Sequence, residues 1–140
     1  MSSRQEDRVA KARRPSRVLI CNHHTLFRDG IKALLEQATS IEIVGEAPTA
    51  RRALSLLERV QPDVVLMDTT MPDLTGSEAI RRIKALYPRV TVLILSLDGD
   101  EKLVAHCLEA GAYDYIRSND QPVRLKRAIN NACRKVAHAA

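Results

Sequence analysis

The chain has 140 residues, enough for one domain with a hydrophobic core, and its 45% hydrophobic and 28% charged residues are ordinary for a globular protein. No apolar run approaches the roughly 20 residues that a membrane-spanning helix needs, and the polar N-terminus lacks the apolar segment of a secretory signal. We therefore expect a cytoplasmic protein that does not contact a membrane.

Positive charge is concentrated at the N-terminus. The net charge is +5, and residues 1–15 contain five basic and two acidic side chains. Such a tail can contact nucleic acid or an acidic partner, but no aromatic residue accompanies the charges here. The composition favours a disordered, solubilising tail at 1–15, followed by one folded domain at 16–140.

The three cysteines give no sign of a disulfide or metal framework. Cys21, Cys107 and Cys133 are odd in number, far apart, and lack the spacing of metal ligands. The pattern predicts free, buried or half-buried thiols in a reducing compartment.

After Pro15, short apolar runs alternate with segments whose apolar residues recur at helical spacing. In chain order they predict strand 17–21, helix 25–37, strand 41–47, helix 49–60, strand 63–68, helix 75–87, strand 90–96, helix 101–110, strand 113–117 and helix 121–138. Continuous apolar strands that alternate with helices are typical of a parallel sheet covered on both faces. We predict an α/β fold, a flavodoxin-like doubly wound five-stranded parallel sheet of order 2-1-3-4-5 with five helices.

This topology also predicts where a site would lie. In doubly wound sheets, ligands bind beyond the carboxyl ends of the strands, where the first and third strands diverge. The residues at those ends are Asn22, His23, His24, Asp68, Thr69, Thr70, Ser96, Tyr115, Arg117 and Ser118.

Three motifs at these ends carry a resemblance to one family. They are VLICNHHTLFR at 18–28, VVLMDTTMPDLTG at 64–76 and GAYDY at 111–115. Together they resemble the response-regulator receiver domain of two-component systems, over residues 17 to 138. Further similarity, in VGEA at 44–47, PDVVLMD at 62–68 and AGA at 110–112, points to the class that precedes a LuxR-type helix-turn-helix.

The resemblance implies roles for three residues. Asp68 matches the aspartate that accepts a phosphoryl group from a histidine kinase. Ser96 matches the hydroxyl residue that contacts the phosphoryl oxygen, and Tyr115 matches the aromatic switch residue of the fifth strand.

Three other positions depart from the family pattern. Asn22 and His23 stand where the family has two acidic Mg²⁺ ligands, and Ser118 stands where it has a lysine that pairs with the phosphoryl group. Only Asp68 and the carbonyl of Thr70 remain as candidate metal ligands, so we expect no cofactor and weak or absent Mg²⁺ binding. Phosphoryl transfer relies on positioning and charge, so these losses predict a crippled reaction.

Compensation by neighbouring residues has two candidate routes. Arg117 adjoins Ser118, but strand alternation is expected to turn it towards a helix-covered face or solvent. His23, His24 and Asp68 could form a transition-metal site. The sequence favours a plainer arrangement, in which His23 hydrogen-bonds within the pocket and His24 faces the surface or caps the first helix.

Three functions follow from these residues. The leading hypothesis is a non-enzymatic, phosphorylation-independent regulatory module, part of a transcriptional regulator, with a protein partner or a homodimer contacting 101–138. The second is a slow phosphoacceptor, modified at Asp68 by a histidine kinase. A phosphatase-like enzyme is the third, but it would need a second aspartate where Thr70 stands. DNA contact is expected only through a C-terminal domain beyond this chain, and whether the chain is truncated or a stand-alone receiver stays open.

Overall fold

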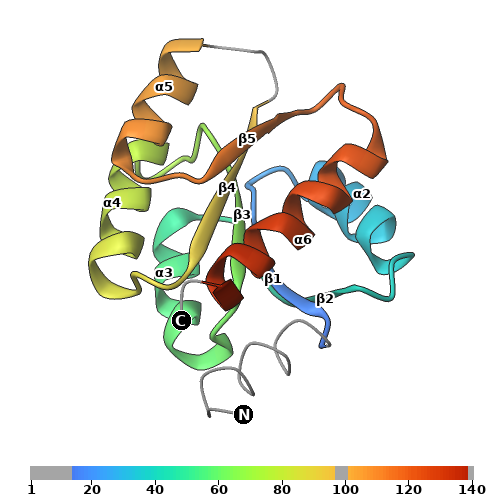
Figure 1. The fold of residues 1–140 in the computed structure, drawn as a ribbon. Coiled ribbons are helices and arrows are strands. Elements are labelled where there is room, and N and C mark those ends of the chain that lie inside the picture. The colour runs from blue at the N-terminus through green and yellow to red at the C-terminus, as the bar shows by residue number, and fades with distance from the viewer. Residues whose placement is uncertain (1–13, 97–100, 139–140) are drawn as a thin grey trace, which may run out of the picture.

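The computed structural model describes residues 14–96 and 101–138, with side chains described as far as residue 134. Strands and helices alternate within these ranges (Figure 1): β1 (Ser16–Cys21), α2 (Thr25–Glu36), β2 (Ile41–Ala47), α3 (Ala50–Val60), β3 (Val64–Asp68), α4 (Gly76–Leu86), β4 (Thr91–Ser96), α5 (Glu101–Ala110), β5 (Asp114–Arg117) and α6 (Pro122–His138). The predicted tail at 1–15 lies outside the described residues, apart from its last two positions.

The strands form one parallel sheet in the order β2-β1-β3-β4-β5. The predicted α/β fold, with strand order 2-1-3-4-5 and five helices over the described ranges, is therefore confirmed. The chain leaves β1 for one edge of the sheet and returns to β3 on the other side of β1, which creates the predicted switch point.

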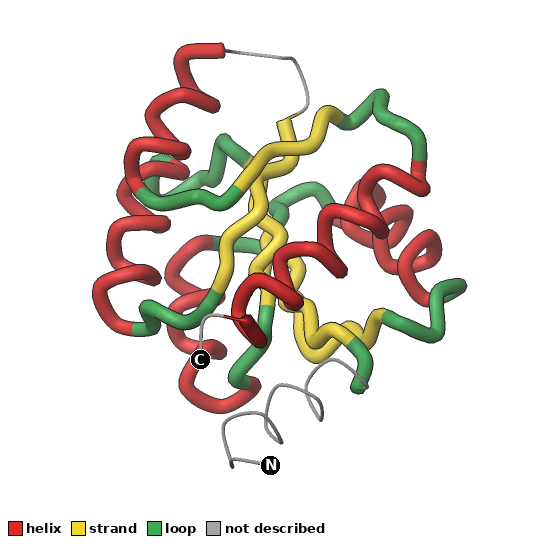
Figure 2. Tube along the Cα trace, in the orientation of Figure 1, coloured by secondary structure: helices red, strands yellow, loops and turns green. Residues whose placement is uncertain are grey.

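Helices cover both faces of the sheet (Figure 2). On one face, α3, α4 and α5 pack against alternate residues of β1, β3 and β4, such as Leu19, Val65 and Ile94. On the other, α2 and α6 pack against the intervening residues, such as Ile20 and Leu66. Because β3 and β4 are buried along their whole length, they are apolar almost without interruption.

The predicted boundaries differ from the structure by one residue at some ends. Thr49 and Thr75 lie just before α3 and α4 as N-cap residues, and their side-chain oxygens accept hydrogen bonds from the amides of Arg52 and Glu78. A cap residue is only half helical, so periodicity alone does not separate it from the first turn. Gly111 follows α5 directly, with a φ of 123° that glycine tolerates.

The predicted buried thiols are confirmed, since none of Cys21, Cys107 and Cys133 forms a disulfide and all three are buried. Burial raises the pKa of Cys21 to about 12 and that of Cys107 to about 11, so both remain protonated thiols at neutral pH. Across the described ranges, no helix is long and apolar enough to cross a membrane.

Candidate functional site

The carboxyl ends of β1, β3 and β4 bring three predicted site residues together. Asn22 follows β1 directly, Asp68 is the last residue of β3, and Ser96 is the last residue of β4. Their strands are adjacent in the sheet, and all three side chains are buried. The site therefore occupies the switch point that the sequence predicts.

The Asp68 carboxylate accepts three long hydrogen bonds. The Asn22 Nδ2 donates to Oδ2 at 3.4 Å, while the Thr70 amide and the Thr69 hydroxyl donate to Oδ1 at 3.2 and 3.5 Å. Burial raises the pKa of Asp68, although the Thr70 hydrogen bond and the Coulombic influence of His23 and His24 oppose that rise. The site thus holds a buried carboxylate with little compensation for its charge.

Asn22 is held by hydrogen bonds on several sides. Its backbone amide donates to the Ala47 carbonyl at 3.0 Å, and its side-chain Oδ1 accepts from the His24 amide at 2.8 Å. The side-chain nitrogen, a donor, therefore faces Asp68. An amide nitrogen cannot coordinate a hard cation, whereas the carboxylate that the family carries at this position can.

The two histidines differ from their predicted arrangement. Their ring centroids lie 3.8 Å apart with the planes tilted by 40°, so the two neighbouring rings contact each other. The Nδ1 of His23 is buried and has no hydrogen-bond partner within the described part of the chain, so the predicted hydrogen bond in the pocket is wrong for this atom. His24 is exposed, as predicted, and its side chain does not cap α2.

A transition-metal site at His23, His24 and Asp68 also lacks support. Among residues 14–96 and 101–138, no three or more side chains of histidine, cysteine, aspartate or glutamate gather in a way that could hold a metal ion.

The remaining predicted residues lie on β5 and just after it. Tyr115 is half-buried and, with Ser96, Arg117 and residues of α5, lines a cavity of about 250 Å³. Arg117 pairs in register with Ser96 and is exposed, as predicted from strand alternation. The amide of Ser118 donates to the Ser96 carbonyl at 2.9 Å, which places Ser118 beside the end of β4.

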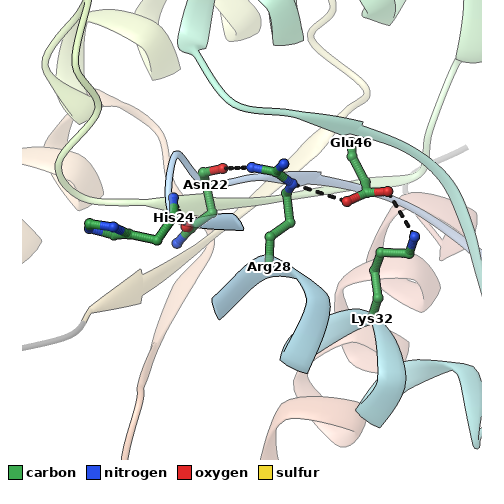
Figure 3. Close-up of polar contacts among 5 residues, drawn as sticks. All are labelled: Asn22, His24, Arg28, Lys32 and Glu46. Atoms are coloured by element: carbon green, nitrogen blue, oxygen red, sulfur yellow. Dashed lines mark hydrogen bonds and ion pairs between the residues drawn. The ribbon is translucent and has the colours of Figure 1, made fainter. Parts of the chain in front are cut away.

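The sequence reasoning missed a polar cluster next to Asn22 (Figure 3). Arg28 Nη1 donates to the Asn22 carbonyl at 2.6 Å, and its Nε donates to Glu46 Oε1 at 3.0 Å. Lys32 Nζ lies 2.9 Å from Glu46 Oε2. The hydrogen bond from Lys32 lowers the pKa of Glu46. Burial raises that pKa, and the hydrogen bond from Arg28 lowers it further. A charged residue near the end of the half-buried strand 41–47 was the signal that could have indicated this cluster.

Asp73 was also missed. It lies in the loop between Asp68 and α4, and its two carboxylate oxygens accept hydrogen bonds from the amides of Ala50 and Arg51, at 3.0 and 2.9 Å. Although burial opposes it, these bonds to the first turn of α3 lower the pKa of Asp73. The loop that follows Asp68 is therefore tied to α3.

Comparison with known proteins identifies the class. Residues 18–130 match the response regulator receiver domain, so the chain belongs to this family. The fold agrees: a receiver domain protein from Clostridium thermocellum superposes with a TM-score of 0.81 at 28% identity, over 89% of this chain and 99% of that one. The chain is thus a receiver domain of two-component signalling, as the sequence motifs predict.

Its similarity extends to regulators of the LuxR type. A LuxR-family response regulator from Aurantimonas sp. SI85-9A1 superposes with a TM-score of 0.80 at 29% identity, over 85% of each chain. The transcriptional regulatory protein DegU of Brevibacillus brevis is 40% identical over 99 residues, which are 71% of this chain and 42% of DegU. The chemotaxis protein CheY of Thermotoga maritima is 34% identical over 81% of this chain and 94% of CheY. The chain spans about half the length of most of the curated regulators that it matches.

Proposed function

We propose that this receiver domain is a regulatory module that works without phosphorylation of Asp68. One observation carries the proposal: at the end of β1, an amide donor of Asn22 faces Asp68 at 3.4 Å, where the family has an acidic metal ligand. The next residue, His23, supplies an imidazole in place of the second acid.

These residues do not fit a Mg²⁺ ion. Mg²⁺ requires several hard oxygen ligands in octahedral geometry, and Asn22 Oδ1 already accepts a hydrogen bond from the His24 amide. Asp68 and the Thr70 carbonyl remain as the only oxygen ligands suggested by the family pattern. Ser118 carries no charge that could pair with a phosphoryl group, and Arg117 is exposed beside it. We infer that Mg²⁺ binds weakly or not at all.

The output of such a module is a contact with another protein. We place the contact on α5, β5 and α6, within 101–138, where Leu108, Tyr113 and Val123 expose apolar surface and Arg124 and Arg127 are exposed. The partner is a second protein or a second copy of this chain. The relatives include transcriptional regulators about twice as long as the match. We therefore infer a cytoplasmic, non-enzymatic part of a transcriptional regulator, whose DNA contact lies in a C-terminal domain outside this chain.

A slow phosphoacceptor is the second candidate. It is favoured by the position of Asp68 at the end of β3, with Ser96 at the end of the adjacent β4. In this alternative a histidine kinase modifies Asp68 despite the altered surroundings. No observation favours a phosphatase-like enzyme.

Intact-mass analysis separates the two candidates. The protein is incubated with Mg²⁺ and acetyl phosphate, next to a typical receiver domain as positive control and the Asp68→Ala variant as negative control. We expect at most a trace of phosphoryl adduct on the wild-type chain. A near-complete adduct that disappears in Asp68→Ala would establish the phosphoacceptor instead.

A further inference from the structure

Arg28 occupies a protected position beside the candidate site. It lies on the first turn of α2, close to the end of β1, and its side chain is only 13% exposed. Its guanidinium bonds in two directions, through Nη1 to the Asn22 carbonyl at 2.6 Å and through Nε to Glu46 at 3.0 Å (Figure 3). These bonds connect helix α2, strand β2 and the end of strand β1.

The hydrogen bond from Arg28 to Asn22 lies where the backbone hydrogen bonds of the sheet end on β1. Asn22 follows the last residue of β1, and its amide still donates to Ala47 on β2. Its carbonyl is bonded by Arg28, and its side chain bonds to His24 on one side and Asp68 on the other. The bond from Arg28 is the shortest of these, at 2.6 Å, and its donor is charged; charge-assisted bonds are about twice as strong as neutral ones.

The side of the Arg28 guanidinium that faces away from Asn22 is bonded to Glu46. Glu46 accepts from Arg28 with one oxygen and pairs with Lys32 through the other. A guanidinium holds its donors in one fixed plane, so the bonds to the carbonyl and the carboxylate set its orientation, whereas the donors of an ammonium group rotate freely. Glu46 therefore fixes the orientation in which Arg28 approaches Asn22.

We propose that Arg28 is a positioning residue that fixes the backbone at the carboxyl end of β1 and thereby directs the Asn22 side chain towards Asp68. The site is then organised by protein groups alone. This inference rests on the proposed function in one respect only, namely that no metal ion draws Asn22 and Asp68 together.

Hydrogen exchange measured by NMR tests the proposal on the whole chain. Arg28→Gln should make the His24 amide, which donates to Asn22 Oδ1, exchange about tenfold faster relative to the core amide of Leu66. The Asn22 side-chain amide resonances should shift in the same variant. Arg28→Lys keeps the charge but not the planar fork, so it should show the same changes and serves if Arg28→Gln does not fold. Lys32→Gln is the matched control because it removes the other partner of Glu46 and leaves Asn22 untouched.

A second measurement, of Mg²⁺ affinity, separates a positioning role of Arg28 from a purely electrostatic one, because the two roles predict changes of affinity in opposite directions. In the Asn22→Asp/His23→Asp background, in which Mg²⁺ ligands are restored, Arg28→Gln should weaken Mg²⁺ binding because the ligands lose their placement. A purely Coulombic role predicts tighter binding, since a nearby cation is removed. Unchanged His24 and Asn22 signals, or tighter Mg²⁺ binding, would overturn the proposal. Mg²⁺ binding by the wild-type chain would instead contradict the proposed function, whatever Arg28 does.

Discussion

Asn22 shows how a change of one functional group alters the chemistry of a site. A carboxylate at this position would offer two oxygen ligands, whereas the amide offers one oxygen, already bonded to the His24 amide, and one donor that faces Asp68. The remaining carboxylate, Asp68, is buried at 3% exposure. The site therefore lacks most of the negative charge that attracts a divalent cation.

Restoring the acids should restore Mg²⁺ binding. Wild-type protein is titrated with Mg²⁺ while NMR shifts around Asp68 are followed, and we expect no saturation in the low millimolar range. Asn22→Asp/His23→Asp should saturate, because it supplies hard oxygen ligands next to Asp68. Asp29→Asn, an exposed change on α2, is the control for non-specific charge effects. Saturable binding by the wild-type chain would refute the prediction.

The buried Asp68 should lower stability as the pH rises. Its folded-state pKa is raised by burial, so the native state binds more protons than the unfolded state between the ordinary pKa and the raised one. Stability is therefore lost as the pH rises through that window. Asp68→Asn removes this loss, so its free energy of unfolding relative to wild type should be more favourable at about pH 7 than at about pH 4. Urea unfolding of both proteins at both pH values measures this difference. If the difference is the same at the two pH values, the pKa of Asp68 is not raised in the folded protein.

Some residues of the site could be predicted from the sequence and others could not. Asp68 and Ser96 end continuous apolar strands, so strand direction alone places them at the same edge of the sheet. Arg28 and Asp73 act through contacts between segments far apart in the chain, and a local pattern can indicate a charged residue in a strand but not the partner that it contacts. That the buried Nδ1 of His23 finds no hydrogen-bond partner among the described residues could not be predicted from the sequence.

At the scale of elements, replacing either of two helical glycines with alanine should change the stability of the protein in opposite directions. A Cβ on Gly76, the first residue of α4, would lie 2.8 Å from the carbonyl oxygen of Thr69, directly after Asp68. A Cβ on Gly30, in α2, would meet nothing within 4 Å. Gly76→Ala should therefore destabilise the protein by about 1–3 kcal/mol, whereas Gly30→Ala should stabilise it by about 0.5–1 kcal/mol.

Urea unfolding of both variants at one pH is the measurement for this pair. Because both variants replace glycine with alanine in a helix, the difference between their free energies of unfolding reports how closely α4 approaches the loop after β3. Equal effects of the two alanines would show that this loop moves away freely, and that its position is not fixed by packing.

Element order was the most predictable feature of the chain. Apolar periods of strand and helix type alternate clearly, and Pro122 and Gly111 lie at helix ends that suit them. The first residues of α3 and α4 differ by one position from the predicted ones because Thr49 and Thr75 cap the helices through side-chain hydrogen bonds. Capping depends on geometry that periodicity does not report.

For the whole molecule, the proposed output surface can be tested against the site. Arg124→Glu and Arg127→Glu change exposed side chains of α6, far in sequence from Asp68. If the output is a contact through 101–138, these reversals should weaken self-association or partner binding more than Asp68→Asn does. Sedimentation of the three proteins measures this. The opposite ranking, with Asp68→Asn the most damaging, would favour control through the aspartate.

The topology of the whole chain follows from rules that do not depend on detail. Parallel strands need crossover connections, and here the crossover helices bury both faces of the sheet. Five strand–helix units therefore allow only a few strand orders. We propose that the function of this fold depends on a few groups at one edge of the sheet, where Asn22, His23 and Ser118 stand in place of the charged residues of the family pattern.

The central proposal is that this receiver domain works without phosphorylation of Asp68, because its site does not hold Mg²⁺ and a phosphoryl group. The most direct measurement is an NMR spectrum with and without Mg²⁺ and beryllofluoride, a mimic of the phosphoryl group. The wild-type spectrum should not change, whereas Asn22→Asp/His23→Asp/Ser118→Lys should show shifts that spread from Asp68 to Ser96 and Tyr115. Saturable shifts of Ser96 and Tyr115 in the wild-type chain would contradict the account.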